Sequence, residues 1–212
     1  MAEKKMPQPL SWENELKYQN SIVCGVDEAG RGPLVGRVYA AAVILPYEKR
    51  EDEALLALND SKKLSEKKRF LLADEIKRLA VSYCVAYSTV EEIETINILE
   101  ASLLAMRRAI DGLSVRPGIA LIDGNISRGF QLEAHALVGG DGISPSIAAA
   151  SILAKTERDR WCCEVLDKEY PMYGFAKHKG YGTKAHYDAI SEFGPCPEHR
   201  MSFLKKFYEK QS

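Results

Sequence analysis

Two apolar segments on either side of a glycine-rich turn constrain the fold of this chain most strongly. Residues 21–27 read SIVCGVD and residues 37–45 read RVYAAAVIL, so both are rich in the β-branched and apolar side chains that strands favour. The second segment is almost continuously apolar, which predicts a central strand with both faces covered. Residues 28–36 contain three glycines and a proline, and this composition predicts a loop.

The rest of the chain alternates between strand and helix patterns. Short apolar or alternating runs predict further strands over residues 81–89, 119–122 and 131–138. Helical spacing predicts helices over residues 65–79, 98–110, 144–171, 183–193 and from 201 onward. The longest helix begins with Ser144-Pro145, a cap followed by a first-turn proline, and its small residues 148–151 predict close packing against another element. This order of elements predicts an α/β fold with a mixed sheet.

The length and composition fit one structural unit. The 212 residues are 46% hydrophobic and 28% charged, which suits a globular chain with a sizeable core. The longest apolar stretch, Val38 to Leu45, has strand length and falls far short of the roughly 20 residues that span a membrane. The first ten residues also lack the apolar stretch of a signal peptide. We therefore expect a cytoplasmic protein with no membrane partner.

Cysteine spacing and charge narrow the class of protein further. The five cysteines are odd in number and form no C-x-x-C pair, which argues against a zinc site or a disulfide framework and predicts free thiols. The net charge of −1 does not by itself indicate a nucleic-acid binder. Basic residues nevertheless gather within residues 62–69 and near the C-terminus, either as solvated faces or as contacts for a polyanion.

Acidic residues at strand ends carry the most chemical information. Asp27 and Glu28 close one predicted strand, Asp123 follows a second, and Asp141 lies between glycines after a third. Ligand sites in α/β sheets gather where strands end, although glycine-flanked aspartates are also ordinary turn residues. Four converging carboxylates would repel one another, and divalent cations relieve that repulsion. An all-oxygen site favours Mg²⁺ or Mn²⁺, and two such ions support phosphodiester cleavage.

The Gly30-Arg31-Gly32 turn directly follows the first acidic pair. Glycines allow a backbone to approach a ligand closely, so exposed N–H and C=O groups can contact a sugar hydroxyl and its phosphate. A 2′-hydroxyl is the group that distinguishes RNA from DNA at such a contact. The alternative interpretation is a tight turn that carries a surface arginine.

Five motifs in this order resemble bacterial ribonuclease HII, the type 2 ribonucleases H. They are D-E-A-G-R-G-P at 27–33, D-S-K-K-L-S at 60–65, A-A-S-I-L-A-K-T-E-R-D at 149–159, H-K-G-Y-G-T at 178–183 and E-H-R-M-S-F at 198–203. Each motif is modestly specific, and the ordered set covers nearly the whole chain. The resemblance implies a ribonuclease H-like fold, with a five-stranded mixed sheet flanked by helices. It also implies a catalytic core over residues 1–170 and a C-terminal helical extension over residues 171–212, packed together as a single structural unit.

The resemblance implies a site of four acids that match Asp27, Glu28, Asp123 and Asp141. The first and third are expected to be direct metal ligands, and the other two complete the shell. The chain departs from the family at the fourth, where the usual Lys-Gly-Asp-Ser or Lys-Ala-Asp-Ser is replaced by Gly-Gly-Asp-Gly at residues 139–142. Asp159 is therefore the rival fourth acid, and we expect it to have a structural role instead, such as pairing with an arginine.

The resemblance also implies substrate contacts. Residues 30–32 are expected to read the 2′-hydroxyl, and Tyr181 to stack on the sugar of the following deoxynucleotide, since aromatic faces stack on nucleotides. Lys62 and Lys155 match phosphate-facing positions, where lysine supplies a point charge. For either lysine, a surface or packing role is the alternative.

The expected activity is that of a metal-dependent endoribonuclease. It would hydrolyse the RNA strand of RNA–DNA hybrids and incise 5′ of single ribonucleotides in duplex DNA, by two-metal in-line attack of water that leaves a 3′-hydroxyl and a 5′-phosphate. A monomer is expected. Two rivals stay open: a resolvase-like or exonucleolytic nuclease of the same broad fold, and a non-catalytic hybrid-binding module. Activity on all-DNA junctions and none on hybrids would favour the first. Tight hybrid binding that Asp27→Asn leaves intact, with no cleavage at any Mg²⁺ or Mn²⁺ level, would favour the second.

Overall fold

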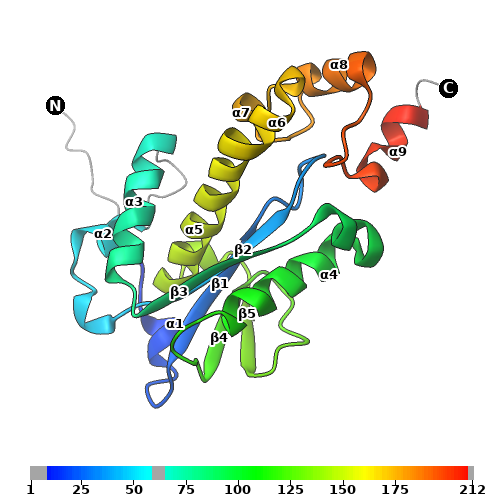
Figure 1. The fold of residues 1–212 in the computed structure, drawn as a ribbon. Helices are drawn as coiled ribbons and strands as arrows, with labels where there is room; N and C mark the ends of the chain where they lie inside the picture. The colour runs from blue at the N-terminus through cyan, green and yellow to red at the C-terminus, as the bar shows by residue number, and fades with distance from the viewer. Residues whose placement is uncertain (1–8, 59–64, 210–212) are drawn as a thin grey trace.

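The computed structural model describes residues 9–58 and 65–209. Its centre is a five-stranded mixed sheet with the order β3-β2-β1-β4-β5 (Figure 1). The strands are β1 (Val23–Ala29), β2 (Val38–Ile44), β3 (Ser82–Ser88), β4 (Ile119–Asp123) and β5 (Glu133–Leu137). β1, β2 and β3 pair antiparallel, whereas β4 and β5 run parallel to β1. The predicted α/β class and five-stranded mixed sheet are confirmed.

β1 begins and ends two residues later than the sequence pattern predicts. The loop predicted from residue 28 begins after Ala29, because Glu28 pairs with Ala40 and Ala29 pairs with Tyr39 in the hairpin with β2. The glycine-rich composition of the turn hid two residues that still belong to the sheet. The acidic pair therefore lies inside a paired strand and not in a flexible loop.

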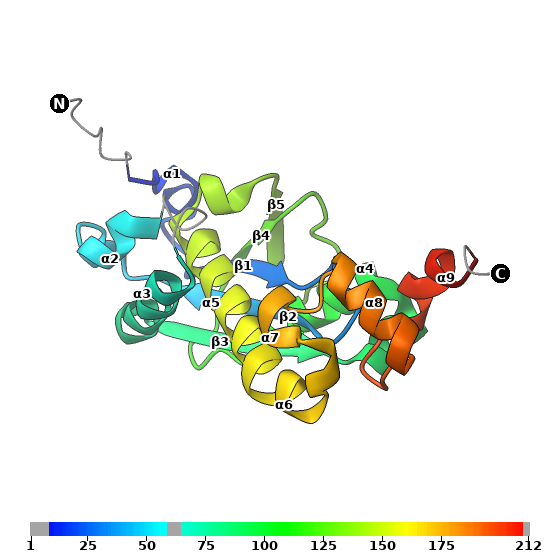
Figure 2. The same ribbon diagram turned by 90° about the horizontal axis from the view of Figure 1, so that it is seen from above.

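Helices cover both faces of the sheet, as Figures 1 and 2 show from two directions. α3 (Glu66–Leu79) and α5 (Pro145–Trp161) pack on one face, and α4 (Val90–Asp111) packs on the other. The central strand β2 is buried along its whole length: Ala41 and Val43 enter the core beneath α3 and α5, while Ala40 and Ala42 enter the core beneath α4. The predicted central position of this apolar strand is confirmed.

The start of α5 lies directly against β1. A Cβ atom added to Gly25 would overlap the backbone carbon of Ser146 and the backbone nitrogen of Ile147. The buried small residues Ala148, Ala149 and Ala150 continue this close approach. The packing predicted from the small residues of this helix is confirmed, and it holds α5 over the carboxyl end of β1.

α4 begins eight residues before its predicted start at residue 98. Asn97 interrupts it with a positive φ of 68°, and its Oδ1 accepts hydrogen bonds from the backbone N–H groups of Leu99 (3.0 Å) and Glu100 (3.2 Å). The predicted helix is the part that follows this internal cap. The earlier part has its own capping box between Thr89 and Glu92, which the apolar periodicity did not reveal.

The C-terminal region packs beyond the hairpin end of β1 and β2 (Figure 1). α5 continues through a π-helical turn (Cys162–Leu166) into α6 (Asp167–Glu169), and is followed by α7 (Phe175–His178), α8 (Lys184–Phe193) and α9 (Met201–Glu209). Residues from these elements share a third core with Leu34 and Val35 of the glycine-rich turn. The short helices α1 (Glu13–Leu16), α2 (Glu53–Leu56) and α7 were not predicted.

The sequence also predicts free cysteines and no membrane-spanning segment. All five cysteines have free thiols, as their spacing predicts. Within the described part of the chain, no helix is both long enough and apolar enough to cross a membrane.

Candidate active site

The register of the sheet brings two of the predicted acids to one place. β1 and β4 are parallel neighbours, and Val26 pairs with Ile122. Asp27 and Asp123 each follow one residue later, so they lie side by side at the carboxyl ends of adjacent strands. Because Val26 and Ile122 belong to the core beneath α4, the alternation of side chains directs the two aspartates to the opposite face, toward α5.

Asp27 is a buried acid in unfavourable surroundings. Its side chain is only 6% exposed, and its Oδ1 accepts a hydrogen bond of 2.6 Å from the backbone N–H of Glu28. Burial raises the pKa of Asp27 well above its usual range, and the nearby Glu28 and Asp123 raise it further, while a hydrogen bond with Ser151 of α5 opposes the shift. The ionised carboxylate is therefore destabilised unless a cation joins it.

Arg31 is a cationic neighbour of Glu28. Arg31 Nη1 donates to Glu28 Oε1 at 3.3 Å, where the arginine side chain is 49% exposed and the glutamate side chain 15%. Burial raises the pKa of Glu28, the Arg31 charge lowers it, and Asp123 raises it again. The Gly-Arg-Gly turn thus compensates part of the negative charge of the acidic pair.

Asp123 has one carboxylate oxygen that is buried beside Gly140. Its Oδ1 has no hydrogen bond among the described residues, and it faces Gly140, where an added Cβ would lie 3.2 Å away. Gly140 begins the short 3₁₀ turn Gly140–Gly142 that carries Asp141, so the fourth predicted acid follows the residue that touches Asp123. An orphaned carboxylate oxygen of this kind is costly to bury, and it points to a cation as its missing partner.

The acids fit a divalent cation by their chemistry. Asp27, Glu28 and Asp123 influence one another electrostatically, and their donor atoms are all carboxylate oxygens, which Mg²⁺ and Mn²⁺ prefer. Within residues 9–58 and 65–209, no three Asp, Glu, His or Cys side chains already form a cation cage. The fit therefore rests on the donor set and on the orphaned oxygen of Asp123.

A cleft of about 340 Å³ opens beside this acidic edge. Its lining consists of Glu28, Ala29, Gly30, Arg31, Gly32, Ser151, Lys155 and Tyr181. The ring of Tyr181, 44% exposed, lies near the turn, since a Cβ on Gly32 would be 3.8 Å from its Cε1 atom. Lys155 Nζ lies 5.9 Å from the centre of the same ring. The structure thus gathers the predicted turn, aromatic residue and lysine around one space.

Asp159, the rival fourth acid, has a structural setting. Its buried carboxylate accepts a hydrogen bond of 2.7 Å from Lys155 Nζ and lies 3.8 Å from Arg69 Nη1. This confirms the predicted pairing with an arginine and adds a lysine one helical turn away. The other predicted lysine, Lys62, lies outside the described residues.

Some residues at the site were not singled out from the sequence. Ser151, which lines the cleft and bonds to Asp27, lies one turn before Lys155 on α5, and Asp159 lies one turn after it. This spacing of i, i+4 places the three polar side chains on one face of α5, and it was the available signal. Arg200 offered no comparable signal, because the backbone carbonyls to which it donates are distant in the sequence.

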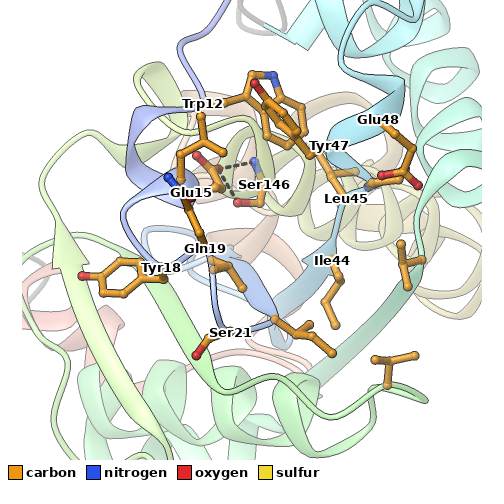
Figure 3. Close-up of a pocket in the computed structure, with 16 residues that line it drawn as sticks. Trp12, Glu15, Tyr18, Gln19, Ser21, Ile44, Leu45, Tyr47, Glu48 and Ser146 are labelled. Atoms are coloured by element: carbon orange, nitrogen blue, oxygen red, sulfur yellow. Dashed lines mark hydrogen bonds between the residues drawn. The ribbon is translucent and has the colours of Figure 1, made fainter.

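A second, larger hollow of about 710 Å³ lies at the opposite end of the sheet (Figure 3). Trp12, Tyr47 and Ile44 are among its mainly apolar lining residues, and Glu15 accepts a hydrogen bond of 3.1 Å from the backbone N–H of Ser146 at the start of α5. None of the predicted site residues that the structure describes lines it. This hollow therefore carries none of the chemistry predicted for those residues.

Comparison with known proteins identifies the family. A sequence model described as ribonuclease HII matches residues 24–206. The chain belongs to the ribonuclease HII family. A ribonuclease HII of Burkholderia thailandensis is 56% identical over 182 residues, which cover 86% of this chain and 83% of the relative. A ribonuclease HII of Albidiferax ferrireducens is 53% identical over 182 residues, with 86% of each chain covered.

Solved structures of ribonucleases HII and H2 share the fold. The crystal structure of ribonuclease H2 from Pyrococcus horikoshii superposes with a TM-score of 0.73 at 26% identity, covering 89% of this chain and 97% of that one. Ribonuclease HII in a PCNA complex from Archaeoglobus fulgidus gives a TM-score of 0.68 at 27% identity, covering 85% and 94%. The chain is therefore a type 2 ribonuclease H, a metal-dependent endoribonuclease of a family that acts on RNA–DNA hybrids.

Proposed function

We propose that this ribonuclease HII incises duplex DNA on the 5′ side of a single embedded ribonucleotide, in addition to cutting RNA–DNA hybrids. The observation that carries the proposal is the shared cleft, in which Glu28, the Gly30-Arg31-Gly32 turn and the ring of Tyr181 all face one space. The turn offers backbone groups to a ribose 2′-hydroxyl, and the ring offers a face to the next sugar. This combination suits a junction from RNA to DNA.

The acids define where the scissile phosphate would lie. We propose Asp27 and Asp123 as direct ligands, with Glu28 and Asp141 completing the shell. When bound, two Mg²⁺ or Mn²⁺ ions supply the charge that activates a water and stabilises the leaving oxygen. Their positive charge would also offset the burial and the repulsion between the acids, which together raise the pKa of Asp27 and of Glu28.

The neighbouring residues orient the substrate. Lys155 supplies a point charge that a phosphate can approach, while its bond to Asp159 fixes its position on α5. Arg31 holds Glu28 at the edge of the cleft. Water attacks the phosphate in line with the departing oxygen, which leaves a 3′-hydroxyl and a 5′-phosphate. In this proposal the 2′-hydroxyl selects the substrate and does not act as the nucleophile.

Analysis of the product ends tests this mechanism. A duplex with one ribonucleotide, labelled at either end, should yield a 3′-hydroxyl on the upstream DNA and a 5′-phosphate on the ribonucleotide. A matched duplex with a 2′-O-methyl group at that position should resist cleavage, because the methyl group obstructs the contact with the turn. A 2′,3′-cyclic phosphate among the products would contradict the proposal, because it shows that the 2′-hydroxyl was the nucleophile.

A further inference from the structure

The segment Glu198-His199-Arg200 connects the C-terminal region to both loops that line the cleft. It lies between α8 and α9, next to the hairpin end of β1 and β2 (Figure 1). The Gly36 N–H donates to the Glu198 carbonyl at 2.8 Å, and the Arg200 N–H donates to the Leu34 carbonyl at 2.8 Å. These residues have no role in the chemistry described above.

Arg200 holds the glycine-rich turn from beneath. Its side chain is completely buried, and the guanidinium donates only to backbone carbonyls of that turn. Nε donates to Gly36 at 2.8 Å, Nη1 to Arg31 at 3.1 Å and to Pro33 at 2.9 Å, and Nη2 to Gly30 at 2.7 Å. The planar guanidinium fixes the direction of these four carbonyls. It therefore determines which other backbone groups of the turn can face the cleft.

His199 reaches the other loop through His186. The Cys196 N–H donates to His199 Nδ1 at 2.9 Å, so the proton of neutral His199 is on Nε2. His199 Nε2 lies 3.0 Å from His186 Nε2, and His186 Nδ1 lies 3.0 Å from the Tyr181 carbonyl, which can only accept. One set of tautomers satisfies every contact: His199 donates to His186, and His186 donates to Tyr181.

The two loops also meet each other. The Leu34 N–H donates to the Gly180 carbonyl at 2.9 Å, and Gly32 lies against the Tyr181 ring. A shift of either loop would therefore change the distance between the turn that faces the ribose and the ring that faces the next sugar.

We propose that Glu198-His199-Arg200 is a positioning element that sets the spacing between the Gly30-Arg31-Gly32 turn and Tyr181, and thereby the recognition of the RNA–DNA junction. This inference rests on the proposed function, because it assigns the two loops to the two sugars of a junction. Arg200 and His186 act through the loops and do not touch substrate.

Two pairs of variants test the positioning role. His186→Asn retains an N–H near the position of Nδ1 and should preserve the bond to the Tyr181 carbonyl, whereas His186→Leu removes it. Arg200→Lys keeps the charge but cannot reach four carbonyls, and Arg78→Lys, at an exposed ion pair with Glu75, is its matched control. We expect His186→Leu and Arg200→Lys to lower kcat/KM for the single-ribonucleotide duplex at least tenfold, mainly through KM. Arg78→Lys should stay within about threefold of the wild type. His186→Asn, which keeps the bond to the Tyr181 carbonyl but loses the acceptor for His199 Nε2, should lower kcat/KM less than His186→Leu does.

Hydrogen exchange separates positioning from loss of fold. In Arg200→Lys, amides of residues 30–36 should exchange faster than in the wild type, and in His186→Leu those of residues 179–183, while the amides of β2 keep their protection. Equal kcat/KM for His186→Leu and His186→Asn, or faster exchange throughout the sheet, would overturn the inference. If the wild type cuts only long hybrids, the proposed function fails. The inference is then tested by KM for the long hybrid, which Arg200→Lys and His186→Leu should still raise. An unchanged KM for the hybrid would overturn it.

Discussion

Two buried aspartates in this enzyme have opposite surroundings. Asp27 lies among other acids, with no compensating cationic partner in the described part of the chain, whereas Asp159 lies between Lys155 and Arg69. An uncompensated buried carboxylate reduces the stability of the fold, and a compensated one contributes to it. The first arrangement is typical of a functional site, and the second of a structural ion pair.

Asp27→Asn should separate stability from activity. The substitution removes a buried charge and keeps an oxygen that can accept from the Glu28 N–H, so the metal-free protein should gain about 1 kcal/mol, or about 2–4 °C in Tm for a chain of this size. Cleavage should fall by roughly two orders of magnitude or more. Thermal unfolding in chelator, beside a cleavage assay, measures both effects. A lower Tm in chelator would contradict the view that this charge opposes folding.

Asp159→Asn should have the opposite effect on stability. Loss of the charge leaves Lys155 and the half-buried Arg69 without their shared acid, so the free energy of unfolding should fall by about 1–3 kcal/mol. Denaturant unfolding at neutral pH measures this change. If the substitution left stability unchanged but abolished metal-dependent cleavage, Asp159 would replace Asp141 as the fourth acid.

The sequence predicted the residues of the site better than their arrangement. Asp27, Glu28 and Asp123 were identified because each ends a strand, but their proximity depends on the register of β1 and β4, which no local pattern encodes. The place of Asp141 in the metal shell stays a prediction. Arg200 could not be found, because its four partners lie more than 160 positions earlier.

At the scale of elements, the contact between α5 and β1 positions the site. α5 carries Ser151 and Lys155 to the acidic edge, and its approach depends on the absence of a side chain at Gly25. The sequence predicted the helix and its tight packing from cap and small residues. It did not predict which strand the helix would touch, because any glycine or alanine of the sheet could have received it.

Gly25→Ala should destabilise the protein by about 1–3 kcal/mol or more, because the added methyl group meets backbone atoms of Ser146 and Ile147 that cannot turn away. Gly142→Ala is the matched control, since nothing lies within 4 Å of its added Cβ. Denaturant midpoints of the two variants provide the comparison. Equal midpoints would show that α5 moves away from β1 at little cost.

At the scale of the whole molecule, a shared hydrophobic core and the hydrogen bonds of Arg200 connect the C-terminal region to the rest of the fold. We propose residues 171–212 as an extension packed on the core of residues 1–170, within a monomer. The third hydrophobic core joins Leu34 and Val35 to Phe175, Ile190 and Leu204 across that division. The family motifs predicted this extension, whereas the hydrogen bonds that attach it became visible only in the structure.

Acid should weaken the hydrogen bonds of the buried histidines within the C-terminal region. Burial lowers the pKa of His186 and of His199 to about 4, below the usual 6.5, while the neighbouring His178 and Cys196 add no compensating negative charge at acidic pH. The unfolded chain therefore binds more protons than the folded chain between pH 4 and 6.5, and stability falls as the pH falls through that range.

The variant His186→Asn separates the contribution of the histidines to the pH dependence of stability from the contribution of the acids. The raised pKa of Asp27 and Glu28 acts in the opposite direction, since the folded state binds the extra protons there. His186→Asn should reduce the slope of unfolding free energy against pH, between pH 4 and 6.5, by up to about 1.4 kcal/mol per pH unit. Urea unfolding at several pH values measures the slope. An unchanged slope would mean that His186 is already protonated in the fold.

The central claim is that the acidic edge of β1 and β4 directs metal-dependent incision at a ribonucleotide. The most direct measurement is cleavage of a DNA duplex with one embedded ribonucleotide, in Mg²⁺, in Mn²⁺ and in chelator, by the wild type and by Asp27→Asn. We predict incision on the 5′ side of the ribonucleotide by the wild type with either metal, and no incision in chelator or by the variant. Incision that persists in chelator, or that Asp27→Asn retains in full, would contradict the claim.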